Sequence, residues 1–137
     1  KYSSIFLFLM EKNGVKIHTV GGVSEVTKNM TVVEYEEDAF IFDCGFFLPA
    51  IVSMEEKDRI MTEKNLKRLG AVPEDSVIDH IRHKVCAQFI SHGHLDHVGA
   101  IPFLSDKYRA PIYATPFTME VLKSLLADNE ITLRNKQ

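Results

Sequence analysis

The chemistry of this chain is concentrated in one short run, in which four potential metal ligands fall within six residues. These are His92, His94, Asp96 and His97, which follow directly after an apolar segment. Where a strand runs out into extended backbone, residues two apart project to the same side, so His92 and His94 can offer imidazoles to one metal ion. Asp96 and His97, on the turn that follows, point towards a second position nearby. This density of ligands predicts a hydrolytic metal centre with two sites.

The ligand types suggest both the metal and the reaction. Imidazole and carboxylate groups suit zinc, with manganese or iron as competitors. Two ions about 3.5–4 Å apart can bridge a hydroxide and hold both oxygens of an in-line displacement. Gly93 relieves crowding between the histidines, and Gly99 with Pro102 predicts the start of a helix packed behind the site.

A structural role competes with the metal-binding one for each histidine. A lone histidine near a strand end is usually a surface or satisfied core residue, and this interpretation is preferred for His18, His80 and His83. The run from His92 to His97 differs because four ligand-type residues share one short spacing.

The elements that position these residues alternate between strands and helices in the later part of the chain. Hydrophobic patterning predicts strands over 4–10, 15–20, 30–36, 39–43, 85–90 and 111–114, and helices over 54–69, 99–108 and 116–127. Lys12-Asn13-Gly14 predicts a turn between the first two strands. Thr115 is a capping residue for the last helix, with Pro116 in its first turn. Ile131-Thr132-Leu133 resembles the beginning of a further strand. The fold class is α/β, a mixed sheet with helices on one face.

Composition is that of an ordinary globular domain. The 137 residues are 45% hydrophobic and 26% charged, with a formal charge of −3. There is no global basic field for nucleic-acid binding, so RNA contact would need local patches or metals. The charges of 54–69 and of Arg82-His83-Lys84 are better explained as solvated surface. The apolar run 5–10 is too short to span a membrane, and both Cys44 and Cys86 are expected to be buried thiols, which indicates a cytoplasmic location.

Three motifs resemble one known family, and they occur in the family's order. His92-Gly93-His94-Leu95-Asp96-His97 matches the HxHxDH signature of the metallo-β-lactamase superfamily, and Val98 to Pro102 resembles its β-CASP nuclease branch, in particular the archaeal type of ribonuclease J. Upstream, Val20 to Met30 resembles the glycine-rich loop after the first strand, and Phe40 to Gly45 resembles the strand that carries the first acidic motif. The resemblance covers residues from about 15 to 127.

The resemblance implies a fold, a reaction and a role for each matched residue. The fold is the amino-terminal half of an αββα sandwich, and the activity is exo- and endonucleolytic hydrolysis of single-stranded RNA with two zinc ions. His92 and His94 would serve the first metal, and Asp96 and His97 the second. Asp96 would also orient or deprotonate the attacking water, while Asp43 would orient a ligand by hydrogen bonding. On sequence grounds alone, Asp43 could equally be a turn former. Gly21 and Gly22 form a tight turn that would admit a nucleic-acid backbone or a neighbouring loop.

The sequence also departs from the superfamily pattern. The superfamily completes its sites with a further histidine, a bridging aspartate and a last histidine downstream, whereas no histidine follows His97 here. We therefore expect residues 1–137 to be the amino-terminal part of a metallo-β-lactamase domain, without its carboxy-terminal half or a β-CASP domain and with incomplete metal sites. An uncovered sheet face would favour a homodimer. Two alternatives stay open: another hydrolase of the superfamily, acting on a thioester, lactone or lactam, and a non-catalytic RNA-binding or assembly module.

Overall fold

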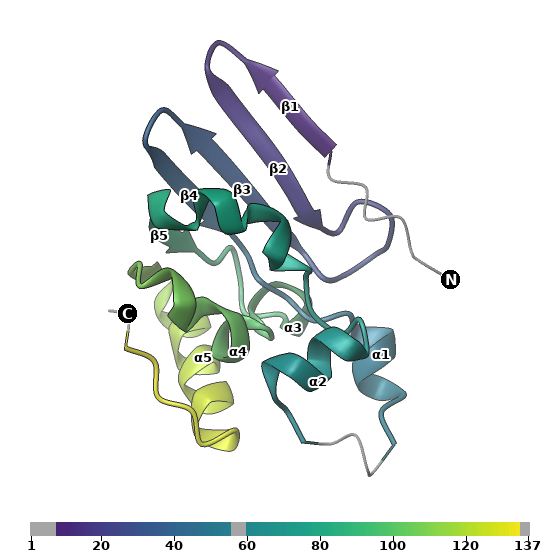
Figure 1. Cartoon of the computed structure of the whole chain (residues 1–137). Helices are drawn as coiled ribbons and strands as arrows, with labels where there is room; N and C mark the ends of the chain where they lie inside the picture. The colour runs from purple at the N-terminus through teal and green to yellow at the C-terminus, as the bar shows by residue number, and fades with distance from the viewer. Residues whose placement is uncertain (1–7, 56–59, 135–137) are drawn as a thin grey trace.

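The computed structural model describes residues 8–55 and 60–134. They form one mixed sheet with the strand order β1-β2-β3-β4-β5-β6 and a set of short helices (Figure 1). The strands are β1 (Phe8–Lys12), β2 (Val15–Gly21), β3 (Met30–Tyr35), β4 (Asp38–Phe42), β5 (Val85–Phe89) and β6 (Ile112–Tyr113). The helices are α1 (Leu48–Val52), α2 (Glu63–Arg68), η2 (Asp75–Lys84), α3 (Leu95–Val98), α4 (Ile101–Leu104), η3 (Ser105–Tyr108) and α5 (Pro116–Asp128).

The sheet changes from antiparallel to parallel at β4. The first four strands pair antiparallel with their neighbours, while β5 pairs parallel with β4 and β6 pairs parallel with β5. The carboxyl ends of β4, β5 and β6 therefore meet at one edge of the sheet. This edge is where the predicted ligands follow β5, so the parallel part of the sheet positions the site.

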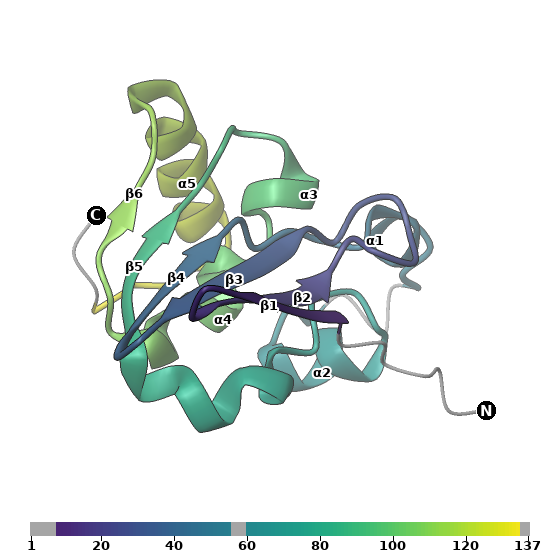
Figure 2. The same ribbon diagram turned by 90° about the horizontal axis from the view of Figure 1, so that it is seen from above.

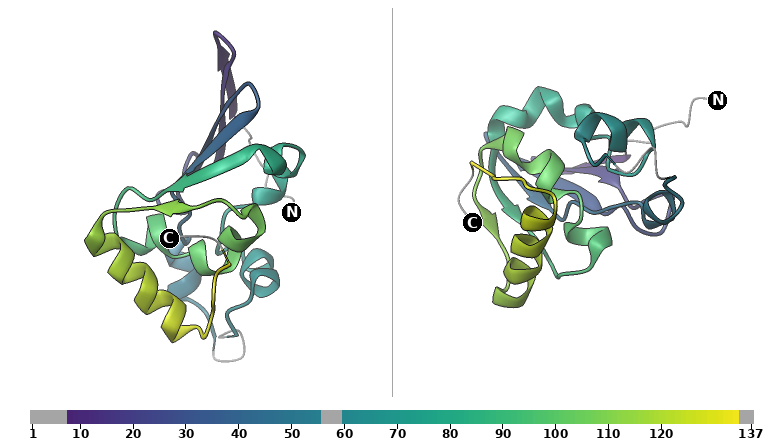
Figure 3. Two further views of the ribbon diagram at one scale, coloured as in Figure 1. Left: turned by 90° about the vertical axis from the view of Figure 1, so that its left-hand side faces the viewer. Right: turned by 90° about the horizontal axis from the view of Figure 1, so that it is seen from below.

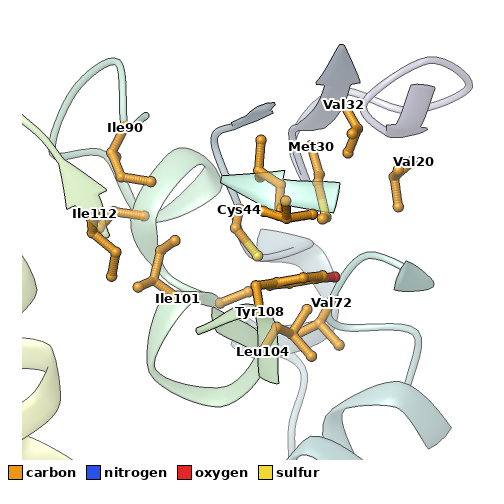
Figure 4. Packing of buried hydrophobic residues seen from close by; sticks show 14 of the residues in the cluster. Val20, Met30, Val32, Cys44, Val72, Ile90, Ile101, Leu104, Tyr108 and Ile112 are labelled. Carbon is orange, nitrogen blue, oxygen red and sulfur yellow. The ribbon is translucent and has the colours of Figure 1, made fainter. Parts of the chain in front are cut away.

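The helices cover one face of the sheet, as expected. Seen from above, the strands lie in front of the helices, and seen from below, the helices lie in front of the strands (Figures 2 and 3). Alternate residues of β3 and β4, such as Val32 and Ile41, are fully buried against the helices. Cys44, Leu104 and Tyr108 lie within the same apolar cluster (Figure 4).

The opposite face of the sheet carries a row of aromatic side chains. Phe42 stacks on Phe89, and Phe89 stacks on Tyr113, each with ring centroids 5.4 Å apart. Phe42 is 43% exposed and Tyr113 is 53% exposed. An aromatic row this open to solvent indicates a surface suited to packing against another layer of protein.

Most predicted strands are confirmed, and the turn between β1 and β2 lies at Asn13-Gly14 as expected. The predicted residues 4–7 lie outside the described part of the chain, and β1 continues to Lys12 instead of ending at Met10. The expected strand at Ile131–Leu133 is wrong, because these residues form no strand and follow the end of α5 as irregular chain.

Two predicted helices are shorter than expected, for local reasons. Of the helix predicted over 54–69, residues 56–59 lie outside the described part of the chain, and residues 54, 55 and 60–62 are not helical. Thr62 adopts extended backbone, and its hydroxyl caps α2 by accepting from the Asn65 N–H. The helix over 99–108 is divided, since Gly99 ends α3 and Pro102 lies in the first turn of α4. Two further elements, α1 and η2, were not predicted. In η2, Asp75, Ile78 and Ile81 are buried at a spacing of three, the period of a 3₁₀ helix.

The expected helix over 116–127 is confirmed as α5, and the Thr115 side chain caps it as predicted. Within the described ranges, no helix is long and apolar enough to cross a membrane.

Candidate metal centre

The site is assembled where β4 and β5 end side by side. Phe42 pairs with Phe89 in the parallel register, and the Asp43 N–H then donates to the carbonyl of Phe89 over 2.8 Å. Asp43 adopts the left-handed conformation, with φ of 61°, which aspartate tolerates better than most side chains. This left-handed conformation at the end of β4 directs the carboxylate across to the end of β5.

The Asp43 carboxylate is hydrogen-bonded on both oxygens. Oδ1 accepts from the Ser91 N–H at 2.8 Å, and Oδ2 accepts from the Ser91 hydroxyl at 2.9 Å. Oδ2 also lies 2.8 Å from Nδ1 of His97, which must donate to an ionised carboxylate. His97 then keeps its proton on Nδ1, and its Nε2 lone pair is free to act as a ligand.

The predicted ligands lie next to one another on the surface. The ring of His92 lies 4.5 Å from the ring of His94 and 4.1 Å from the ring of His97, between centroids. Nε2 of His97 lies 3.5 Å from Oδ2 of Asp96. His92, Asp96 and His97 are partly buried, while His94 is exposed. Three imidazoles and one carboxylate are thus gathered where β5 leads into α3, with His92 and His94 before the helix and Asp96 and His97 within it.

The donor atoms do not close around a single position. In the part of the chain that the structure describes, no group of three or more His, Cys, Asp or Glu side chains is arranged to hold a metal ion. The chemistry of the converging donors nevertheless fits a metal, since neutral imidazole nitrogen and carboxylate oxygen are its usual ligands. Four donors spread over two sites also leave each site short of the three protein ligands that a catalytic zinc takes.

Two segments of backbone, the chain after β4 and α3, are hydrogen-bonded to each other next to the ligands. The N–H groups of Cys44 and Phe46 donate to the carbonyls of His97 and Leu95, at 2.7 and 2.9 Å. A Cβ at Gly45 would lie only 1.6 Å from the carbonyl oxygen of Asp96. The chain after β4 can therefore reach the ligand-bearing turn only with glycine at this position.

Asn29 and Ser91 belong to the site, although sequence reasoning gave neither of them a role. Nδ2 of Asn29 lies 3.3 Å from Oδ2 of Asp96 and 3.2 Å from Nε2 of His97. Only their positions in the sequence could have indicated a role for these two residues. Ser91 directly precedes the ligand run, and Asn29 lies at the end of the glycine-rich loop. Neither residue type is a usual metal ligand, so a search for ligands passes over both.

The glycine pair at the start of that loop forms a close approach, but to the other end of the same loop and not to a neighbouring loop. A Cβ on Gly21 would lie 2.1 Å from the Lys28 carbonyl oxygen, and a Cβ on Gly22 would lie 2.6 Å from Oδ1 of Asn29. The other end of the same loop fills the space that the missing side chains leave. A hollow of about 550 Å³ lies over the loop, with Asp96 in its lining.

The remaining histidines and the basic cluster lie outside the site. His18 is buried, and its Nε2 lies 3.0 Å from Oε2 of Glu34, as expected of a core histidine. His80 and His83 are exposed. Of the basic cluster, Arg82 is exposed and pairs with Asp79, as expected of a solvated surface. Lys84 differs from that expectation, because it is partly buried and donates to the buried Glu34 carboxylate.

The two cysteines differ from each other, contrary to expectation. Cys44 is buried under the site, and burial together with the nearby Asp75 charge raises the pKa of its thiol. It is therefore a neutral thiol rather than a metal ligand. The prediction that Cys86 is buried is wrong, because it lies on the opposite pleat of β5 and is exposed, with Sγ 3.4 Å from the Ala39 carbonyl oxygen.

Comparisons with known proteins agree with this geometry. The model of the family described as the metallo-beta-lactamase superfamily matches residues 23–130. The chain is 43% identical over 122 residues to a Ribonuclease J of Pyrococcus abyssi, and 37% identical over 123 residues to a Ribonuclease J of Methanocaldococcus jannaschii. Each match covers 88% of this chain but only 27% and 28% of the two relatives. The chain therefore spans little more than a quarter of their length.

Solved structures of similar shape include two proteins with named activities. The crystal structure of DIM-1 metallo-beta-lactamase is 20% identical, with a TM-score of 0.49, over 96% of this chain and 50% of that chain. The short form of human tRNase Z is 16% identical, with a TM-score of 0.47, over 86% of this chain and 40% of that chain.

Proposed function

This chain belongs to the metallo-beta-lactamase superfamily, and we propose that the protein it comes from is a ribonuclease J-like enzyme that hydrolyses phosphodiester bonds of single-stranded RNA. The observation that carries the proposal is the convergence of His92, His94, Asp96 and His97 at the ends of two parallel strands, with Asp43 bonded to His97. The two Ribonuclease J relatives support RNA as the substrate, since their identity to this chain extends over most of its length.

In this proposal the ligands divide into two pairs. His92 and His94 hold the first ion, and Asp96 and His97 hold the second, with zinc as the metal that best suits these donors. When bound, the metal pair polarises the phosphate and lowers the pKa of an attacking water towards neutrality.

The side chains of this chain then act around the reacting water. Asp43 keeps the His97 proton on Nδ1, which leaves Nε2 as the ligand nitrogen. The Asp96 carboxylate, beside Nε2 of His97, orients the water and accepts its proton. Ser91 ties the Asp43 carboxylate in place through both its N–H and its hydroxyl. These contacts hold the donors before any ion binds.

We further propose that residues 1–137 supply one part of a larger catalytic unit. The solvent-exposed aromatic row of Phe42, Phe89 and Tyr113 supports this proposal, as does the hollow of about 480 Å³ that lies beside the row and is lined in part by Asp43. The carboxy-terminal half of the metallo-β-lactamase domain would pack on this face and bring the remaining ligands, with a β-CASP domain inserted in it. We place the enzyme in the cytoplasm and expect that the same face, when left open, pairs two copies of the chain.

The substrate is tested by comparing hydrolysis of two substrate classes by the full-length protein loaded with zinc. A 5′-labelled single-stranded RNA and a thioester are offered separately, and cleavage of each is followed over time with and without a chelator. We expect RNA to be cleaved only with metal present, and the thioester to stay intact. Hydrolysis of the thioester with the RNA intact would assign the protein to another hydrolase class of the superfamily. Binding of RNA without cleavage would favour the non-catalytic module.

A further inference from the structure

The Asn29 side chain contacts both members of the proposed second metal pair. Its Nδ2 lies 3.3 Å from Oδ2 of Asp96 and 3.2 Å from Nε2 of His97. The same nitrogen lies 3.1 Å from the backbone carbonyl oxygen of Asp96. Asn29 is 67 residues from Asp96 in the sequence, so this meeting depends on the fold and not on local chain geometry.

The surroundings of Asn29 fix which way its amide points. The Asp96 carbonyl and carboxylate oxygens can only accept, so the two N–H groups of the amide donate to these two oxygens. Both oxygens thus require the NH₂ group of the amide on their side, and the Nε2 lone pair of His97 is left for an ion. The Oδ1 atom is then directed to Gly22, where a Cβ would lie only 2.6 Å away. The absence of a side chain at Gly22 makes room for this orientation.

The backbone around Asn29 is held in a conformation that its sequence does not favour. Thr27 and Lys28 have φ of 86° and 59°, in the left-handed region, and threonine is β-branched. The Lys28 N–H donates to the Phe46 carbonyl, the Asn29 N–H donates to the Asp96 carbonyl, and Gly45 N–H donates to the Asn29 carbonyl, at 2.9, 3.0 and 3.0 Å. These bonds offset the strain and seat Asn29 between the Asp43 turn and the ligand turn.

We propose that Asn29 is a positioning residue of the metal centre, which orients the Asp96 carboxylate beside Nε2 of His97 so that the two can share an ion. This inference rests on the proposed function of the site. The bond to the Asp96 carbonyl engages no ligand atom, so it anchors the amide while the carboxylate binds. Gly22 acts through Asn29, because it leaves space for Oδ1. The loop from Gly21 to Lys28 then places the Asn29 amide at the metal centre.

The test measures zinc binding by the full-length protein in competition with a chelating dye, together with the visible absorption of the Co²⁺ form. Asn29→Ala should weaken the second ion about 10–100-fold, the usual cost of losing a group that orients a ligand, and change the Co²⁺ spectrum of that site. The first ion, on His92 and His94, should keep its affinity. Gly22→Ala should weaken the second ion in the same way, and Asn29→Ala combined with Gly22→Ala should be no weaker than Asn29→Ala alone.

The matched control is Gly14→Ala. Gly14 has the same φ of +78° as Gly22, but a Cβ there meets only the Tyr35 ring at 3.8 Å, so it introduces the backbone strain without touching Asn29. It should bind both ions as the parent does. Unchanged or tighter binding of the second ion in Asn29→Ala would overturn the inference. A double variant of Asn29→Ala and Gly22→Ala that binds the second ion more weakly than Asn29→Ala alone would also overturn it. If the parent protein itself binds no metal and cleaves no RNA, the proposed function fails as well; if only Asn29→Ala behaves like the parent, the inference alone fails.

Discussion

Oδ2 of Asp43 lies 2.8 Å from Nδ1 of His97, so the end of β4 is joined to α3 through a carboxylate and an imidazole 54 residues apart. The bond fixes the tautomer of a ligand by means of a residue that is not itself a ligand.

Removing that carboxylate should therefore weaken metal binding. We expect Asp43→Ala to lower zinc affinity of the full-length protein about 10–100-fold, as measured by competition with a chelator. Ser91→Ala removes a hydroxyl that lies 2.9 Å from Oδ2 of Asp43 and 3.0 Å from Nδ1 of His92, but it leaves the bond between Asp43 and His97, so it should cost the second ion much less than Asp43→Ala does. A loss in Ser91→Ala equal to that in Asp43→Ala would show that the carboxylate does not act through His97.

Gly45 should not accept any side chain. A Cβ there would overlap the Asp96 carbonyl oxygen at 1.6 Å, so we expect Gly45→Ala to lower the free energy of unfolding by about 3 kcal/mol or more and to abolish binding of the second ion. Gly70→Ala is the control, because it has φ of +65° and nothing within 4 Å, and it should cost about 1 kcal/mol. Urea unfolding of both variants measures the loss in the free energy of unfolding. Similar losses in Gly45→Ala and Gly70→Ala would contradict the steric argument.

A buried carboxylate should make stability depend on acid pH. Asp75 is 2% exposed, and its two oxygens lie 2.6 Å from Nζ of Lys67, 2.8 Å from Nζ of Lys107 and 2.7 Å from the Tyr108 hydroxyl. Burial alone would raise the pKa of Asp75, but these partners outweigh it and lower the pKa. The stabilisation is therefore present above the unfolded-state pKa of about 3.9 and is lost as pH falls through the lower folded-state pKa.

Asp75→Asn should remove that part of the acid dependence and cost about 3 kcal/mol at neutral pH, because it leaves two lysines near a neutral group. Unfolding free energies measured between pH 2 and pH 7, roughly the range of carboxyl titration, test this directly. An unchanged slope below pH 4 in the variant, near the unfolded carboxyl pKa, would exclude Asp75 as the titrating group.

The aromatic face should behave as core in the full-length protein. Phe42 is 43% exposed here, yet if the remaining half of the domain covers it, Phe42→Ala should lower the free energy of unfolding by about 3 kcal/mol. Phe117 lies on α5, is 75% exposed and serves as the matched control. Phe117→Ala should lower the free energy of unfolding by less than about 1 kcal/mol. Equal, small costs at both positions would contradict the packing of a second layer on this face.

The sequence was sufficient for the parts of the fold that depend on local pattern. Alternating apolar residues placed β2 to β5 within one or two residues, and the Thr115 cap with Pro116 placed the start of α5. The candidate ligands of the short HxHxDH run could be recognised from the sequence, because they lie within six residues of one another. Patterns of this kind need no knowledge of distant contacts.

The elements that were missed depend on contacts between distant segments. The hydrophobic pattern of η2 covers too few residues to distinguish a 3₁₀ helix from a loop in the sequence. Its Asp75 is buried because lysines from α2 and η3 neutralise the carboxylate, and these contacts depend on the fold. The role of Asn29 could not be predicted either, because it arises when a strained loop meets the Asp96 turn. Cys86 was misplaced because an apolar run does not reveal which of its residues face outward.

The measurement that tests the central claim most directly is cleavage of single-stranded RNA by the full-length protein, compared with its double variant Asp96→Ala, His97→Ala at equal folded concentration. Asn65→Ala, in α2 and away from the ligands, serves as the control for surface substitution. We predict that the double variant loses at least about 100-fold in rate, since one metal pair is removed, while the control keeps the parent rate. Undiminished cleavage by the double variant would contradict the assignment of the run from His92 to His97 as the metal centre.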